Sequence, residues 1–441
     1  MSLLALNMAY EEDDSLTRGA ANPLAGSLCL FGFLLHIILS DPLLGAMGFD
    51  YSGDGGAFYE KIHPGSLFIF LSFFVLLCGQ GNPIKQILLL CQRQLIPFSL
   101  LLLCILFFIY MVIRSGAAGM AFMIDTHMTP PICAIVLCYT PASYCKRVAH
   151  VFVALAFINS LVGIAESIGK FRVFGYDETL AFMREDSFRA SALRGHPLNN
   201  ASFTAIALMV VLGMPYNTLL KTIICAVMSV SLISFGGRAA LGIGLLGLMA
   251  ITALMVFQRF RSRNMSLLQL ILIVTVTILG PLCLIGALYV ALASGMGERL
   301  IAHAHWDDSA QSRTLAFMVF DYLSTPEIFF GVSTDRILDI AYQMNLAVPL
   351  SDIENPWLLM CLYLGVIAFP IWLAATLAFI YWVLKDTPFA LKLALLSYFA
   401  IASTSNSFGR KDSTYLITVT IVMCAMRVIE SKRSESQRRA N

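Results

Sequence analysis

The sequence has few charged residues for its length. Of its 441 residues, 13% are Asp, Glu, Lys or Arg, whereas 58% are hydrophobic. Soluble domains contain roughly 25% charged residues, so this deficit excludes a soluble protein and indicates a chain with many membrane-spanning helices. The mean hydropathy of +0.79 leads to the same conclusion. The net charge of +2 gives no sign of a nucleic-acid partner.

The sequence also lacks a cysteine pattern typical of disulfides or metal sites, and it lacks the features of a cleaved signal peptide. None of the eleven cysteines is part of a C-x-x-C pair, and none lies in a connection that we place outside the cytoplasm. We therefore interpret them as packing residues rather than as disulfides or metal ligands. The N-terminus is acidic at Glu11–Asp14, and no A-x-A site follows the first apolar run. A cleaved signal peptide is thus not expected, and the first apolar run should remain as a membrane anchor.

Apolar runs near the spanning length of about 20 residues dominate the chain. The sequence predicts an all-α polytopic membrane protein with about twelve spans, and the runs are 24–40, 64–80, 95–113, 130–145, 148–168, 198–215, 219–236, 238–257, 266–293, 356–384, 388–406 and 413–427. A cytoplasmic tail, 1–23, precedes the transmembrane domain, 24–427. A basic cytoplasmic tail, 428–441, follows it.

Lysine and arginine gather in alternate connections, which predicts that both termini are cytoplasmic. The pair Arg410–Lys411 is the exception, because it falls in an outside connection. The largest outside connection, 294–355, is long for a loop without structure. Within it, Ser312–Leu323 and Asp335–Leu346 have apolar residues at helical spacing, so short helices along the membrane face are expected.

A polar cluster lies between the fifth and sixth apolar runs. It contains two arginines, a histidine and two asparagines, namely Arg189, Arg194, His196, Asn199 and Asn200. The guanidinium fork fits phosphate, and Pro197 favours a helix start whose free N–H groups also attract anions. The alternative is a solvated loop in which the asparagines cap the next helix.

A second arginine site follows the turn at Gly236–Gly237. Arg238 begins a predicted span, and the glycines allow a ligand to approach the backbone closely. The alternative is an interfacial arginine that extends toward the headgroups. Because Arg238 and the polar cluster are predicted on the same side, the two sites together suit a diphosphate.

The large loop adds two further groups of candidates. Ser309 and Arg313 are four residues apart and share one face if they are helical. A metal site built from the neighbouring histidines and aspartates is conceivable but weaker, and we expect none. Asp352, Glu354 and Asn355 precede a long apolar helix, where either carboxylate suits a general base. Helix capping alone would also explain these three residues.

These stretches, in this order, resemble the O-antigen ligase and polysaccharide polymerase (Wzy-like) superfamily of bacterial inner membranes. The matching segments are Arg194–Ala201, Ser234–Ala239, Asp307–Arg313, Pro326–Val332 and Glu354–Leu358. Ligases of this family carry a histidine where this chain has Glu354. That departure favours a polymerase, or a ligase whose base is a carboxylate.

The resemblance implies a metal-independent glycosyl transfer without a cofactor on the periplasmic side of the inner membrane. Units carried on undecaprenyl diphosphate would be joined into exopolysaccharide or O-antigen. Membrane lipids, a chain-length regulator and a flippase are the expected partners. The diphosphate would be held by Arg189, Arg194, Arg238 and Arg313, with Asn199, Asn200, Asn355 and Ser309 as further substrate contacts. The base is Glu354, Asp352 or His196. The alternatives are a ligase acting on lipid A core or protein, and a transporter of lipid-linked oligosaccharide.

Overall fold

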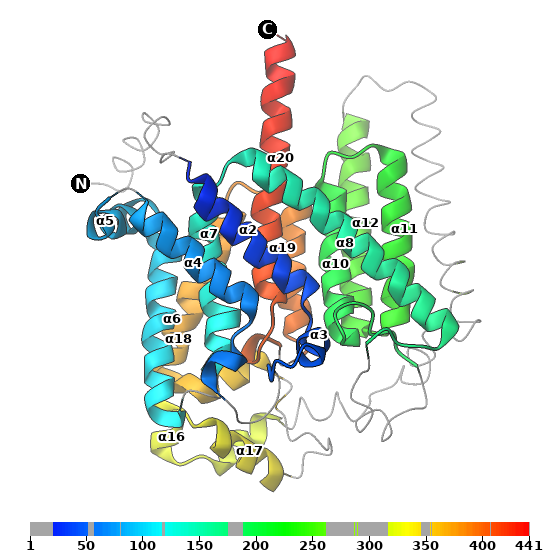
Figure 1. Cartoon of the computed structure of the whole chain (residues 1–441). Helices are drawn as coiled ribbons and strands as arrows, with labels where there is room; N and C mark the ends of the chain where they lie inside the picture. The colour runs from blue at the N-terminus through cyan, green and yellow to red at the C-terminus, as the bar shows by residue number, and fades with distance from the viewer. Residues whose placement is uncertain are drawn as a thin grey trace.

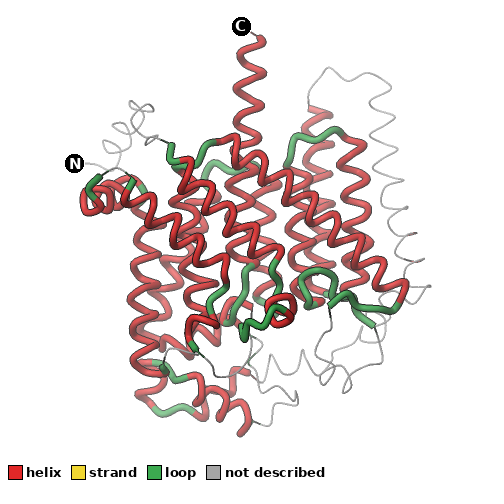
Figure 2. Tube along the Cα trace, in the orientation of Figure 1, coloured by secondary structure: helices red, strands yellow, loops and turns green. Residues whose placement is uncertain are grey.

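The structure is a computed structural model. It describes residues 21–51, 57–79, 81–116, 120–174, 188–261, 316–344, 353, 355–405 and 407–440, together with residues 286 and 289. Within these ranges every regular element is a helix and none is a strand (Figures 1 and 2). The expected all-α class is therefore confirmed for the described part of the chain.

The helices follow the apolar runs closely. The α-helices are α2 (Pro23–Ile38), α3 (Asp41–Ala46), α4 (Pro64–Cys78), α5 (Pro83–Arg93), α6 (Leu95–Ser115), α7 (Thr129–Cys138), α8 (Ala142–Gly169), α10 (Pro197–Gly213), α11 (Thr218–Phe235), α12 (Arg238–Arg261), α16 (Thr325–Phe330), α17 (Thr334–Gln343), α18 (Pro356–Leu384), α19 (Phe389–Ala402) and α20 (Thr414–Ala440). Three-residue-per-turn helices form η1 (Phe58–Lys61), η4 (Ala316–Tyr322) and η5 (Ser407–Gly409), and a π-helical segment forms η3 (Met123–Met128).

Six described helices are long and apolar enough to cross a membrane, or seven if the bent pair α4–α5 counts as one span. The six are α6, α8, α11, α12, α18 and α20. Four other predicted spans correspond to apolar helices of 10–17 residues. The run 266–293 lies outside the described residues apart from 286 and 289, so the count of twelve stays a prediction. The described part has the helices expected of a multi-pass membrane protein.

One predicted boundary is wrong. The sequence predicted a run over 130–145 and a second over 148–168, whereas α7 ends at Cys138 and α8 begins at Ala142. Pro141 stands immediately before α8. Because proline has no N–H and its ring crowds the preceding turn, the break falls beside Pro141 and not at the basic residues 146–147.

The two ends of the bundle differ in what they carry. The beginning of α2, α5 and the C-terminal end of α20 lie at one end, and α3, α16 and α17 lie at the other (Figure 1). Helix α10 lies inside the bundle, where it packs against α8, α11, α12, α19 and α20. The end of the bundle that carries α3 also carries the loops that form the pocket described below (Figure 2).

Helices α2 and α4 cross at very close range. A Cβ added to Gly32 would lie 2.5 Å from the carbonyl oxygen of Gly65, and a Cβ on Gly65 would lie 2.5 Å from the oxygen of Gly32. Small residues allow helix backbones to approach in this way. The crossing places the last turn of α2 beside the first residue before α4.

The described part of the large loop is folded. The expected helices over Ser312–Leu323 and Asp335–Leu346 correspond to η4, which is a 3₁₀ helix, and to α17. Between them, α16 begins with a capping box in which Ser324 and Glu327 are paired. The basic tail predicted at 428–441 is a helical continuation of α20 as far as Ala440.

Candidate functional site

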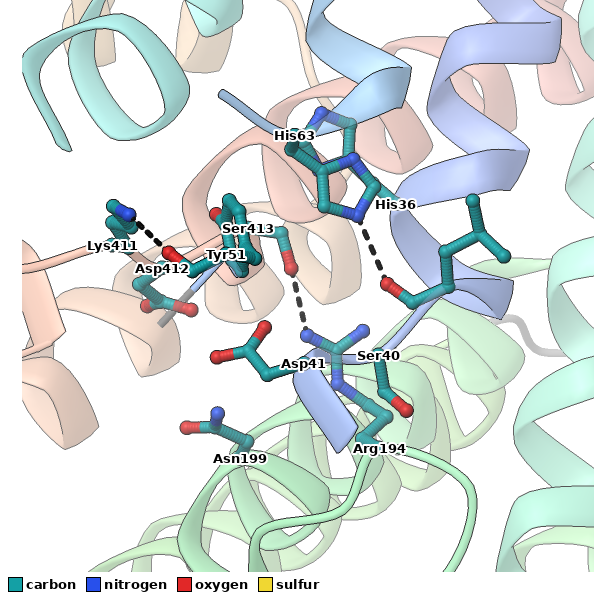
Figure 3. A pocket seen from close by; sticks show the side chains of 11 residues that line it. His36, Ser40, Asp41, Tyr51, His63, Arg194, Asn199, Lys411, Asp412 and Ser413 are labelled. Atoms are coloured by element: carbon teal, nitrogen blue, oxygen red, sulfur yellow. Dashed lines mark hydrogen bonds between the residues drawn. The ribbon is translucent and has the colours of Figure 1, made fainter. Parts of the chain in front are cut away.

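A pocket opens at the end of the bundle that carries α3 (Figure 3). Its empty volume, including the open space at its mouth, is about 380 Å³. Five separate stretches of the chain supply its walls. The lining residues are His36, Leu39, Ser40, Asp41, Tyr51, His63, Arg194, Asn199, Lys411, Asp412 and Ser413.

Arg194 is the central cation of this pocket. Its side chain is only 8% exposed, and its guanidinium carbon lies 5.0 Å from the centre of the Phe203 ring. Its Nη2 donates to the hydroxyl of Ser413 at 2.9 Å, whereas Nε and Nη1 have no hydrogen-bond partner among the described residues. Burial lowers the pKa of Arg194 and the carboxylates of Asp412 and Asp41 raise it, but arginine remains charged in either case. Two buried N–H donor groups are thus available to a ligand.

The loop before α10 is held by buried polar groups of α8. Glu166 accepts a hydrogen bond from the backbone N–H of Val173 at 2.7 Å, and from those of Ser191 and Ala192 at 2.8 Å each. Asn159 accepts a bond from the N–H of Leu193 at 3.1 Å. A buried carboxylate is costly unless its oxygens are fully satisfied, as they are here. These bonds hold the backbone of residues 191–193, directly before Arg194, and thereby fix the position of Arg194.

Two asparagines of the predicted cluster have different roles. Asn199 lines the pocket. Asn200 is buried beneath the loop, where its amide donates to the carbonyl oxygens of Ser191 and His196. The residue that caps α10 is His196, so Asn200 neither caps this helix nor lines the pocket.

The loop before α20 is anchored by η3. The hydroxyl of Thr126 donates to the carbonyl of Arg410 at 2.8 Å and accepts from the N–H of Asp412 at 2.9 Å. The Nε2–H of His127 donates to the carbonyl of Phe408 at 2.9 Å. Single π-helical turns within helices are rare and occur frequently at functional sites. The position of residues 411–413 in the pocket is therefore fixed by η3, a segment that is distant in sequence.

Lys411 and Asp412 add one charge of each sign. The ammonium of Lys411 donates to the carbonyl of Tyr51 at 2.6 Å and lies 4.4 Å from the centre of that ring. Asp412 accepts from the N–H of Thr414 at 2.8 Å, which caps α20. Burial raises the pKa of Asp412, and it lowers the pKa of Lys411. With Arg194 and Asp41, the pocket contains two cations and two carboxylates, so directed N–H groups rather than net charge would attract an anion.

Two histidines stack on each other in the pocket wall. The rings of His36 and His63 are 3.9 Å apart and nearly parallel. His63 has both ring nitrogens paired, because Nε2–H donates to the carbonyl of Leu39 at 2.9 Å and Nδ1 accepts from the N–H of Gly65 at 3.0 Å. Burial lowers the pKa of His63 to about 4, so its ring is neutral near pH 7.

The predicted arginines do not all meet at this pocket. Arg194 lines it, and its role as a diphosphate ligand stays a prediction. Arg189 and Arg238 do not line it. The side chain of Arg189 instead lies beside the turn between α11 and α12, where its Cδ is 3.3 Å from the position that a Cβ on Gly236 would take. The chain turns sharply between Arg189 and Arg194, with positive φ at Ala192 and Gly195. The two arginines of one loop therefore diverge.

The other predicted residues have diverse positions. His196 caps α10, since its Nδ1 accepts from the N–H of Leu198 at 3.2 Å, and burial lowers its pKa to about 4. Asn355 caps α18 by accepting from the N–H of Leu358 at 3.1 Å. Ser309, Arg313, Asp352 and Glu354 lie outside the described residues.

Sequence reasoning missed most of the pocket. His36, Asp41, His63 and Asp412 were not singled out, because each lies at the end of an apolar run where a polar residue is unremarkable. Lys411 had a signal, since it belongs to the pair that violates the charge rule for outside loops. Among the described residues no three His, Cys, Asp or Glu side chains are grouped as metal ligands would be.

The arrangement suits a ligand with an anionic group and a hydroxyl. Arg194 and Lys411 offer donors for anionic oxygens, and the carboxylates and imidazoles offer acceptors. Neither a scan against protein-family models nor a search of curated proteins gave a match.

Proposed function

We propose that this chain is a membrane enzyme that joins oligosaccharide units carried on a lipid diphosphate. The observation that carries the proposal is the buried guanidinium of Arg194, whose Nε and Nη1 have no partner among the described residues and which lines a pocket at one end of the bundle. A buried donor without a partner costs free energy, so a ligand oxygen that accepts from it binds strongly.

The chemistry of glycosyl transfer fits such a site. When a hydroxyl attacks the anomeric carbon of the donor sugar, the bond to the lipid diphosphate breaks and negative charge develops on the leaving oxygen. Fixed N–H donors that face this oxygen stabilise the transition state more than the ground state. Arg194 would supply these donors, and Lys411 would add a second positive charge nearby.

The proposed orientation rests on the basic residues. Helix α5, the N-terminal part of α8 and the C-terminal part of α20 carry lysines and arginines, and these segments lie at the end opposite the pocket (Figure 1). Such residues favour the cytoplasmic side. The pocket would then open on the outer, periplasmic side of the bacterial inner membrane, where lipid-linked repeat units are joined into exopolysaccharide or O-antigen.

The test compares Arg194→Ala and Arg194→Lys with the wild type in cells that lack the chromosomal gene. Polymer chain length is read from a gel, and lipid-linked units are counted in the outer leaflet. We expect both variants to lose long polymer while single lipid-linked units accumulate outside, because lysine cannot present the guanidinium fork. Arg147→Lys, at an exposed position of α8 near the opposite end, is the matched control and should leave chain length unchanged.

The same experiment separates the alternatives. A ligase would leave long lipid-linked polymer that is not transferred to its acceptor. Normal chain length in Arg194→Ala at normal protein level would contradict the proposal.

A transporter is the second candidate, and one observation favours it. Helix α18 is broken at Gly365, whose φ of 74° and ψ of 166° are not helical. Broken helices line the substrate sites of many transporters, because their free backbone groups contact the substrate. For a transporter, loss of function would leave the lipid-linked units in the cytoplasmic leaflet, where they are reached only after the membrane is permeabilised.

A further inference from the structure

His36 differs from the other histidine of the pocket in its hydrogen bonds. It lies in the last turn of α2, is 2% exposed, and lines the pocket beside Arg194. Its Nε2 is 3.1 Å from the hydroxyl of Ser66, whereas its Nδ1 is buried and has no partner among the described residues. A ring nitrogen in the wall of a pocket with no protein partner is available to a ligand.

The partners of Ser66 determine which nitrogen of His36 carries the proton. The hydroxyl of Ser66 donates to Asp125 Oδ1 at 2.6 Å. Asp125 also accepts from the hydroxyl of Tyr51 at 2.9 Å and from the backbone N–H of His63 at 3.1 Å.

A hydroxyl has only one hydrogen to donate. Since the hydrogen of Ser66 points to Asp125, its oxygen must accept from His36, so Nε2 is the protonated nitrogen. Nδ1 then carries a lone pair, which is the state that a general base requires.

We propose that His36 Nδ1 is the general base of the glycosyl transfer; this assignment rests on the proposed function. The hydroxyl oxygen of the acceptor sugar forms a bond to the anomeric carbon of the donor. The bond from that carbon to the diphosphate oxygen breaks, and its electron pair leaves with the diphosphate. The hydroxyl proton moves to Nδ1 of His36, and it later passes to solvent.

The surroundings of His36 fit a transient proton. The stacked His63 and the guanidinium of Arg194 both disfavour a lasting positive charge on the ring, whereas Asp125 favours it through Ser66. Arg194, with its two unpaired N–H donors, and His36, with its unpaired Nδ1, line the same pocket (Figure 3). Arg194 can therefore stabilise the leaving diphosphate while His36, in the same pocket, accepts the proton of the attacking hydroxyl.

The test uses purified protein in liposomes that contain the lipid-linked material extracted from cells lacking the gene. The initial rate of chain lengthening is measured from pH 4 to pH 9, and competition by farnesyl diphosphate measures donor binding. General-base catalysis contributes a factor of about 10² to 10⁴, so His36→Gln should lower the rate by this factor. Its competition by farnesyl diphosphate should stay within about twofold of the wild type, since the N–H groups of Arg194 remain.

Two further readouts distinguish a base from a structural role. The wild-type rate should fall only at the acid end of this range, where His36 becomes protonated, and the residual rate of His36→Gln should lack this low-pH limb. Added imidazole should restore part of the rate to His36→Ala. His150→Gln is the matched control, because His150, on α8, pairs with the hydroxyl of Tyr216 and lies outside the pocket. It should keep both the rate and the low-pH limb.

Ser66→Ala gives an independent readout if the His36 variants fold poorly. It removes the acceptor that fixes the proton on Nε2, so the rate should fall and the low-pH limb should shift. If the wild type lengthens chains while His36→Gln and Ser66→Ala keep its rate and pH profile, the base assignment is wrong and the proposed function stands. If the wild type moves lipid-linked units across the bilayer without lengthening them, both are wrong.

Discussion

Gly195 and Pro42 are in direct contact. A Cβ added to Gly195 would lie 2.2 Å from Cγ of Pro42, and Gly195 has a φ of +70°. Pro42 belongs to the first turn of α3, next to Asp41, and Gly195 follows Arg194. Glycine at 195 thus lets α3 sit on the turn that carries the central arginine, which brings two walls of the pocket together.

The first prediction concerns this contact. Gly195→Ala would add a clash with Pro42 and a positive φ that L-residues avoid, which costs about 1–3 kcal/mol for the backbone alone. We expect a lower melting temperature and weaker competition by farnesyl diphosphate, because Arg194 and Asp41 would be displaced. Gly45→Ala in α3 is the control, since its Cβ would meet nothing within 4 Å. Unchanged binding in Gly195→Ala would show that the contact does not set the pocket.

The second prediction concerns Glu166. Its two carboxylate oxygens accept from three backbone N–H groups, and Gln at this position would turn an N–H₂ group toward one or two of these donors. We expect Glu166→Gln to destabilise the protein by about 1–3 kcal/mol. Polymer length should shorten too, because the same bonds fix the Arg194 loop. Thermal unfolding in detergent measures the loss, and exposed Asp386→Asn should change it little.

The third prediction concerns acid sensitivity. Burial lowers the pKa of His63 from 6.5 to about 4, so the unfolded chain binds more protons than the folded chain between these values. The stability that His63 contributes is therefore present above pH 6.5 and is lost as the pH falls toward 4. At about 1.4 kcal/mol per unit, the loss is at most about 3 kcal/mol.

Melting temperatures at pH 7 and pH 5 test this. His63→Gln should show a smaller decrease than the wild type. Some decrease should remain, because burial also lowers the pKa of His196 to about 4. An equal decrease in wild type and variant would refute the role of His63.

The fourth prediction concerns the break in α18. A Cβ on Gly365 would lie 2.3 Å from the carbonyl oxygen of Phe329, and a Cβ on Gly331 would lie 2.5 Å from that of Tyr363; both glycines have positive φ. Gly365→Ala should therefore release α16 from α18. Faster limited proteolysis within 316–344 would report this, and Gly242→Ala, whose Cβ meets nothing, should cleave at the wild-type rate. Resistance equal to the wild type would mean that α16 is held elsewhere.

Local patterns predicted the helices well. Apolar runs marked almost every long helix, and the turn at Gly236–Gly237 separates α11 from α12 as expected. Pro197 and Asn355 were correctly taken as signals of helix starts. The break predicted between 145 and 148 lies instead beside Pro141, because proline acts on the backbone directly.

The candidate site was predicted only where its residues form a cluster in the sequence. Arg194 and Asn199 were found because they stand close to a histidine and a proline in a short loop. The sequence determined that the chain is helical, apolar and interrupted by this polar loop, since composition and periodicity act over neighbouring residues.

Only the tertiary structure decided which polar residues meet. His36 and His63 come together through the close crossing at Gly32 and Gly65, and Lys411 reaches the pocket because Thr126 and His127 hold its loop. These partners are between 27 and 284 residues apart. Contacts at such separations depend on packing of whole helices, which no local pattern encodes.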